Sequence, residues 1–242
     1  MSNVYLVRHG QAGTRDAYDS LSTLGRCQAR LLGDHFTSHG IRFASAYTGA
    51  LRRQQQTAEE VRKTLADGGV VFPSLTLDQG WDEFDLGRVY QEIAPQLARE
   101  DSTFRSEYED MRAQVQANLE RHEARIHRRW LPCDTRVMDA WIRGRYPYSG
   151  ETWNQFCERV ATCRLKMSEI PQNENVVVFT SATPVAIWIG LSLDVVDHRI
   201  MRLAGALYNA SYSILRLRGD QLRLFSFNAV PHLAAAHLCT RR

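Results

Sequence analysis

The sequence has few of the residues that build metal sites or disulfide frameworks. Its five cysteines are odd in number, and no Cys-x-x-Cys pair stands with matching histidines. This pattern disfavours a structural zinc site and a disulfide-stapled secreted fold, and it favours a reduced, cytoplasmic setting. We therefore expect a protein that works without a metal ion or another cofactor.

A long uninterrupted apolar run is also missing. The most membrane-like stretch, 176–196, is broken by four residues, Thr180, Ser181, Thr183 and Pro184. It predicts a buried strand followed by a buried helix rather than a membrane span. The chain passes from Met1-Ser2-Asn3 straight into a strand-like run, without the basic and apolar regions of a signal peptide. We expect a soluble protein with no membrane partner.

Neither sign of charge dominates. The chain has 30 Lys and Arg against 27 Asp and Glu, a formal charge of +3 that suits a small anionic substrate. One cluster of basic residues stands out, and it comprises Arg121, His122, Arg125, His127, Arg128 and Arg129. Only Trp130 lies near this cluster in the sequence as an aromatic residue that could stack on bases. A solvated helix face, or a cap that gathers an anionic substrate, explains it better than nucleic-acid binding. We predict no nucleic-acid partner.

The first 70 residues alternate between strand and helix patterns. Val4-Tyr5-Leu6-Val7 is a continuous apolar run, typical of a strand covered on both faces. Apolar residues at helical spacing predict a helix over 23–39, with Ser22 or Thr23 as its cap and Gly40 as its stop. A second strand at 43–47 and a second helix at 51–65 follow. This alternation predicts an α/β fold with a doubly wound sheet in one domain spanning 1–242.

The rhythm changes in the middle of the chain. Charge density rises after Gly87, and the spacing predicts one long helix over 104–130. We interpret about 88–150 as a helical, cap-like insertion over the edge of the sheet. The aromatic residues Trp81, Trp141, Tyr146 and Tyr148 either wall a pocket or form a small core of their own. The core pattern resumes with predicted helices at 151–167 and 183–191, a strand at 175–179 and a hairpin of 212–217 with 222–227.

Residues suited to phosphoryl transfer gather where strands are predicted to end. Such a site without a metal needs a nucleophile, cationic donors and an acid for the leaving group. Arg8-His9-Gly10-Gln11 follows the first buried strand, where a histidine can point out of the sheet edge and a glycine lets backbone amides approach an anion. Taken alone, such a histidine is more often a structural residue held by a backbone hydrogen bond.

Further segments fit together with this one, in a fixed order along the chain. They are Ser20-Leu21-Ser22-Thr23-Leu24-Gly25 with Gln28-Ala29, Leu51-Arg52-Arg53-Gln54-Gln55-Gln56-Thr57-Ala58, Glu83-Phe84-Asp85-Leu86-Gly87, Gly150-Glu151-Thr152 and Asn209-Ala210-Ser211. With Arg8-His9-Gly10, this set resembles the histidine phosphatase (phosphoglycerate mutase-like) superfamily over nearly the whole chain. The resemblance implies three α/β/α layers around a mostly parallel central sheet.

The resemblance also implies roles for individual residues. His9 would be the phosphohistidine nucleophile of a metal-independent phosphomonoester hydrolase, and Glu83 its general acid. Asp82 and Asp85 stand so close that either remains an alternative acid. The phosphate group of a small phosphorylated substrate would be held by five residues, Arg8, Gln11, Arg53, Ser181 and Thr183.

One position departs from the family pattern. Similar proteins usually carry a Ser-His-Gly type sequence at the later strand end, and Ala182 stands at the place that matches its histidine. Loss of one transition-state donor commonly slows an enzyme by about 10²- to 10³-fold, so weak activity is expected. Ser181 or Thr183 can substitute in part. The alternatives are an introduced alanine and a phosphate-binding or regulatory homologue with degenerate catalysis.

The segment after the first motif separates two activities within the family. Mutases generally continue with a Trp-Asn pair and a Phe-Thr-Gly-Trp type stretch, whereas this chain has Ala12-Gly13-Thr14-Arg15-Asp16-Ala17-Tyr18. A phosphatase is therefore preferred to a phosphoglycerate mutase-type phosphotransferase. The sequence ranks no particular phosphorylated substrate and indicates no oligomeric state.

Overall fold

A computed structural model describes residues 2–13, 19–167 except 121–131, and 173–241 except 220. The chain divides into two compact units. The first combines Met1–Glu83 with Arg159–Arg242, and the second is Phe84–Glu158. The second unit includes the predicted insertion at 88–150 and extends beyond it at both ends; its function as a cap stays a prediction.

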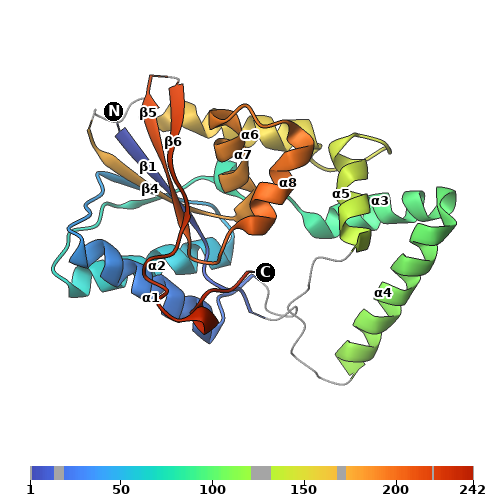
Figure 1. The fold of residues 1–242 in the computed structure, drawn as a ribbon, viewed down its shortest axis with the longest axis horizontal. Helices are drawn as coiled ribbons and strands as arrows, with labels where there is room; N and C mark the ends of the chain where they lie inside the picture. The colour runs from blue at the N-terminus through green and yellow to red at the C-terminus, as the bar shows by residue number, and fades with distance from the viewer. Residues whose placement is uncertain (1, 14–18, 121–131, 168–172, 220, 242) are drawn as a thin grey trace. The chain divides into compact units, whose positions relative to one another are not determined.

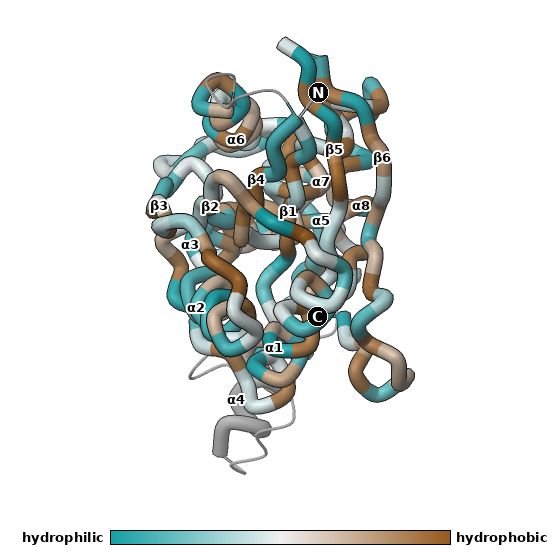
Figure 2. Tube along the Cα trace, turned by 90° about the vertical axis from the view of Figure 1, so that its left-hand side faces the viewer, coloured by the Kyte–Doolittle hydropathy of each residue, from teal (hydrophilic) through white to brown (hydrophobic). Residues whose placement is uncertain are grey.

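Strands of the first unit form one mixed sheet in the described part of the chain. They are β1 (Ser2–Arg8), β2 (Ser45–Thr48), β3 (Leu75–Leu77), β4 (Asn175–Thr180), β5 (Tyr212–Arg218) and β6 (Gln221–Ala229). Their order across the sheet is β3-β2-β4-β1-β5-β6, which Figure 2 shows across the view. The pairs among β1, β2, β3 and β4 are parallel, and β5 runs antiparallel to both β1 and β6. The predicted α/β class with a mostly parallel sheet is confirmed.

Helices cover both faces of this sheet (Figure 1). On one face lie α1 (Thr23–Ser38) and α2 (Arg52–Asp67), and on the other lie α7 (Ala182–Ser192) and α8 (Asp197–Ala206). Because side chains alternate along a strand, β1 sends Tyr5 and Val7 to the α1 and α2 side, while its intervening residues face α7. This gives the three layers expected from the sequence.

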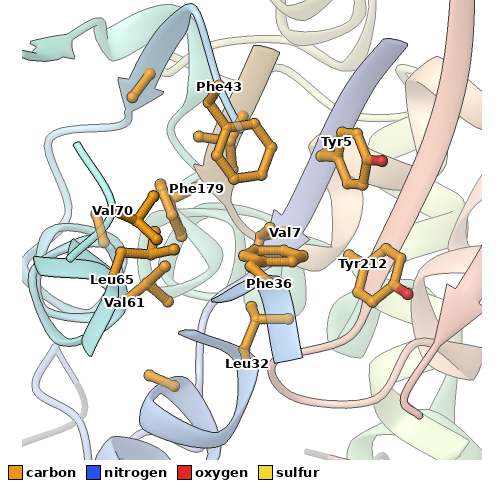
Figure 3. Close-up of a cluster of buried hydrophobic side chains, with 14 of the residues drawn as sticks. Tyr5, Val7, Leu32, Phe36, Phe43, Val61, Leu65, Val70, Phe179 and Tyr212 are labelled. Atoms are coloured by element: carbon orange, nitrogen blue, oxygen red, sulfur yellow. The ribbon is translucent and has the colours of Figure 1, made fainter. Parts of the chain in front are cut away.

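Apolar side chains fill the core on the α1 and α2 side, and they include the residues of β1 and β4 that face these helices (Figure 3). Phe36 and Leu65 are fully buried against β1 and β4, together with Phe179. The ring of Tyr5 lies 5.3 Å from that of Phe43 in an edge-to-face arrangement. These apolar side chains fix the register of the parallel strands, and with it the level at which β1 and β4 end.

The second unit contains α3 (Leu86–Glu100), α4 (Ser102–Glu120), α5 (Pro132–Ile142) and the start of α6, which spans Trp153–Met167. Its core is aromatic: Trp141 contacts Phe84, Trp153 and Phe156, with ring centroids 4.7, 5.5 and 6.2 Å away. Trp141 thus belongs to a small aromatic core within the second unit. This agrees with the interpretation that the aromatic residues of the insertion form a core of their own. The cluster of Arg121, Arg125, Arg128 and Arg129 lies outside the described residues.

Most elements expected from the sequence are present, with ends shifted by a few residues. The predicted long helix at 104–130 corresponds to α4, and its portion beyond Glu120 lies outside the described residues. Sequence patterns missed α3, α5, α8, the short β3 and two 3₁₀ turns, at Gln79–Trp81 and Ala236–Leu238. Within the described ranges, every helix is too short or too polar to cross a lipid bilayer.

Candidate active site

His9 follows the last residue of β1 and is buried, with 3% of its surface exposed. Arg8 pairs with Thr180 in the parallel register, and the His9 N–H donates to the Thr180 carbonyl over 2.9 Å. On the other side, the Ala210 N–H donates to the His9 carbonyl over 3.1 Å. The backbone of His9 is therefore held between β4 and the segment that leads into β5.

Two contacts fix the protonation of the His9 ring. Its Nδ1 lies 2.7 Å from the Gly10 carbonyl oxygen, which can only accept a hydrogen bond. Its Nε2 accepts a hydrogen bond from Nε of Arg53 over 3.2 Å. Both contacts are satisfied by a neutral imidazole with its proton on Nδ1. The lone pair of Nε2 then points toward the guanidinium of Arg53.

Gly10 allows the backbone to pack closely, whereas we expected it to let backbone amides approach an anion. Its N–H donates to the Thr57 hydroxyl over 3.0 Å, and the next N–H, of Gln11, donates to Oε1 of Gln28 over 2.8 Å. A Cβ at Gly10 would collide with the backbone carbonyl of Gly25 in α1. Glycine is needed here because the loop after β1 passes directly against α1, and these two amides serve that packing instead of an anion.

Arg53 lies in the first turn of α2, which follows β2. Its guanidinium contacts His9 through Nε, and one terminal N–H group contacts Asp19 over 3.0 Å. The neighbouring Gln54 donates to the Ser181 hydroxyl and to the Trp81 carbonyl over 2.9 and 3.2 Å. Its side chain thus ties α2 to the end of β4.

Arg8 is buried as the last residue of β1, and its guanidinium donates to the carbonyl oxygen of Leu207, just after α8. Gln11 directs its Oε1 to the Ser22 hydroxyl at the start of α1 over 2.8 Å. The structure thus brings His9 and Arg53 into direct contact, whereas Arg8 contacts a backbone carbonyl and Gln11 a capping hydroxyl. Their binding of phosphate stays a prediction.

The three candidate acids differ in what they contact. Asp82 accepts from the Ala50 N–H over 2.6 Å, and burial raises the pKa of Asp82 although N–H groups of Ala50 and Leu51 stabilise its anion. Asp85 caps α3 by accepting from the Arg88 N–H. Glu83 accepts from the Thr183 N–H at the start of α7 over 3.1 Å. Of the three, Glu83 is the one tied to the end of β4.

The β4 end itself offers no imidazole. Ser181 is buried and caps α7, and its hydroxyl accepts from Gln54. Ala182, the first residue of α7, is partly exposed, and Thr183 is buried with its N–H on Glu83. In the parallel register the residue level with His9 is Ser181, directly after the Arg8 and Thr180 pair.

The sequence singled out Gln28 and Asn209 within motif segments but did not predict that they hold this edge. Gln28 is fully buried in α1 and donates to the Leu238 carbonyl and the Thr240 hydroxyl over 2.7 and 2.9 Å. The Thr240 hydroxyl in turn donates to Asn209, which lies beside the His9 carbonyl. A glutamine on the apolar face of a predicted helix is the signal that was available for Gln28.

The sheet order and the covering helices define an α/β protein in which a buried histidine and a buried arginine meet at one edge of the sheet. Solved structures share this fold over nearly their full length. Bacillus stearothermophilus YhfR is 18% identical with a TM-score of 0.64, covering 96% of this chain and 99% of that one. Phosphoserine phosphatase of Entamoeba histolytica, solved with 3-phosphoglyceric acid, is 17% identical with a TM-score of 0.59, covering 96% and 100%.

The chain belongs to the histidine phosphatase superfamily (branch 1), whose model matches residues 4–135 and 131–230. A curated relative is the mitochondrial serine/threonine-protein phosphatase Pgam5 of Caenorhabditis briggsae, 28% identical over 114 residues. That match takes in 43% of this chain and 38% of the nematode protein. A mycobacterial glucosyl-3-phosphoglycerate phosphatase shares the fold with a TM-score of 0.59 at 19% identity, covering 94% of this chain and 98% of that one.

Proposed function

We propose that this chain is a phosphatase that hydrolyses small phosphomonoesters through a phosphohistidine on His9. The observation that carries the proposal is the ring of His9, held by the Gly10 carbonyl at Nδ1 and by Arg53 at Nε2. A neutral imidazole in this tautomer is a nucleophile, and the adjacent guanidinium suits a tetrahedral oxyanion. Phosphatases among the family's named relatives support the same class of reaction.

In the first step, the Nε2 lone pair of His9 attacks phosphorus, and the bond between phosphorus and the leaving oxygen breaks. The proton stays on Nδ1, where it donates to the Gly10 carbonyl, so the phosphorylated ring carries a stabilised positive charge. Glu83, in its protonated form, gives its proton to the leaving oxygen. Arg53 and Arg8 hold the oxygens of the transferring group, on which negative charge is spread.

In the second step, water attacks phosphorus and Glu83, now a carboxylate, takes one of its protons. The bond between Nε2 and phosphorus breaks, orthophosphate leaves, and His9 returns to its neutral form. No step needs a metal ion, because arginines supply the positive charge. Turnover should therefore survive a chelator.

The absence of a histidine at Ala182 is proposed to make this reaction slow. The Ser181 oxygen accepts from Gln54 and its O–H carries no positive charge, and the Thr183 N–H is used by Glu83, so neither replaces an imidazolium donor in full. The second candidate function, a phosphate-binding or regulatory homologue, is favoured by the same observation. It keeps Arg53 and His9 as a binding site and lacks turnover. A mutase-type phosphotransferase is the less favoured alternative because of the Ala12 to Tyr18 segment.

The test is hydrolysis of p-nitrophenyl phosphate in the presence of a chelator by the unmodified protein, His9→Ala and His198→Ala. His198 is an exposed residue of α8 and serves as the matched control. We expect kcat/KM to fall at least about a thousandfold in His9→Ala and to stay unchanged in His198→Ala. Equal background rates in all three proteins would reject a phosphatase and favour the binding homologue.

A further inference from the structure

Arg53 is engaged by a carboxylate of the chain itself. Its terminal N–H group lies 3.0 Å from Oδ1 of Asp19, and the second carboxylate oxygen, Oδ2, accepts from the Arg52 N–H over 3.2 Å. Arg52 is the first residue of α2, a helix of 16 residues. The carboxylate of Asp19 therefore spans a guanidinium and a backbone N–H at a helix N-terminus, two kinds of donor that also bind phosphate.

The two partners differ in their access to water. The side chain of Arg53 is 8% exposed and that of Asp19 is 54% exposed. A buried guanidinium is costly to leave without an anion, whereas a half-exposed carboxylate returns to water readily. An incoming anion can therefore replace Asp19 on Arg53 without leaving a charge buried and unpaired.

We propose that Asp19 is an internal anion that occupies Arg53 in the resting site and is displaced by the phosphate group of the substrate. The inference rests on the proposed function, which assigns Arg53 to phosphate binding. It adds a residue that lowers phosphate affinity and holds Arg53 in place while the site is empty.

Displacement also affects the nucleophile. In the resting arrangement the same guanidinium donates to Asp19 through its terminal nitrogen and to Nε2 of His9 through Nε. The lone pair needed for attack is thus engaged while Asp19 is bound. When phosphate oxygens take the N–H groups of Arg53, the Nε2 lone pair is released toward phosphorus. Exchange of Asp19 for phosphate therefore couples binding to the readiness of His9.

The first test is the affinity of the full chain for orthophosphate, measured by titration calorimetry for the unmodified protein, Asp19→Asn and Asp67→Asn. Asp67 is an exposed residue at the other end of α2 and is the matched control. We expect Asp19→Asn to bind orthophosphate about two- to fivefold more tightly, the range for loss of a partly exposed ion pair. Asp67→Asn should bind like the unmodified protein.

Weaker or unchanged binding in Asp19→Asn overturns the proposal, since Asp19 would then position Arg53 instead of competing with phosphate. Equal gains in Asp19→Asn and Asp67→Asn also overturn it, because they would reflect net charge alone. Absence of orthophosphate binding in both the unmodified protein and Asp19→Asn overturns it as well.

A second test is a crystal structure of the chain with orthophosphate. We expect phosphate on Arg53 and the contact between Arg53 and Asp19 lost; phosphate bound with that contact retained contradicts displacement. Neither test depends on turnover. A chain that binds orthophosphate more tightly as Asp19→Asn but never hydrolyses p-nitrophenyl phosphate would reject the phosphatase and leave the exchange at Arg53 standing.

Discussion

Two parallel strands, β1 and β4, end side by side at the same edge of the sheet and carry different chemistry. The β1 end presents Arg8 and His9, with the His9 ring held at both nitrogens. The β4 end presents Ser181 and Ala182, of which the first is bonded to Gln54 and the second has no polar side chain. The two strand ends lie at one level, and the residue at 182 lacks the side-chain donor that the proposed reaction would use there.

This difference separates two requirements of the reaction. A nucleophile needs a fixed tautomer and a nearby cation, and the β1 end meets both. Stabilisation of the transferring phosphoryl group needs donors from several sides, and the β4 end lacks an imidazole while its Thr183 N–H contacts the proposed acid Glu83. We therefore expect the phosphoenzyme to form slowly.

The largest effect is expected at the acid. Glu83→Gln keeps the hydrogen bond to the Thr183 N–H but cannot give a proton, so kcat should fall about 10²- to 10⁴-fold. The loss should be greater for an alkyl phosphate than for p-nitrophenyl phosphate, whose leaving group departs without a proton. Asp82→Asn is the control: it removes the charge beside Ala50 and should leave the ratio of the two rates close to that of the unmodified protein. The assignment is contradicted if Asp82→Asn, and not Glu83→Gln, slows the alkyl phosphate more than p-nitrophenyl phosphate.

A gain is expected when the missing donor is supplied. Ala182→His places an imidazole at a partly exposed first residue of α7, and kcat should rise about ten- to a hundredfold, part of what one preorganised donor contributes. Ser181→His is the matched variant, because Ser181 is level with His9 but buried against Gln54. It should lower stability in thermal unfolding. No gain from either variant would show that Ala182 does not limit the rate.

The smallest expected effect concerns the stability of the fold. It tests whether a lower pH destabilises the part of the protein beside β1 without a change in the catalytic residues. Burial, with the nearby charge of His35, lowers the pKa of His232 from 6.5 to about 4, and burial followed by the charge of His39 lowers the pKa of His35. Both rings stack on Tyr212, which pairs with Val7 of β1. The unfolded chain takes up these protons first, so stability present above pH 6.5 is lost as the pH falls toward 4.

The expected loss from His232 is roughly 2–3 kcal/mol. Urea unfolding of the unmodified protein and of His232→Phe, at about pH 7 and about pH 5, measures it. The phenylalanine can still stack on Tyr212 but cannot take up a proton, so its stability should change less with pH. Parallel pH dependence in the two proteins would remove His232 as the cause.

The sequence predicted the sheet and the two helices on one face well, because their signals are local. The continuous apolar run at Val4 to Val7 and the helical spacing after Ser22 correspond to β1 and α1. It missed α3, where Pro95 lies inside the helix and the capping residue Asp85 was a candidate acid. It also missed β3, whose three residues are too few to show a period.

At the site, the sequence identified residues but could not show which of them touch. The contact between His9 and Arg53 joins positions far apart in the chain, and so does the contact between Glu83 and Thr183 that separates Glu83 from its two acidic neighbours. The partner Asp19 was not recognised, because it belongs to no motif that signals phosphate chemistry, and Gln28 was part of a quoted segment but was given no role. Tertiary packing alone brings them to the His9 loop.

The central claim is that His9 accepts the phosphoryl group on Nε2. Rapid-quench trapping with a ³²P-labelled phosphomonoester, followed by ³¹P NMR of the denatured phosphoprotein, tests it most directly. The account predicts an acid-labile, base-stable phosphoprotein in the unmodified chain, phosphorylated on the Nε2 of His9 and absent from His9→Ala. Label that is acid-stable, lies on Nδ1 or persists in His9→Ala would contradict it.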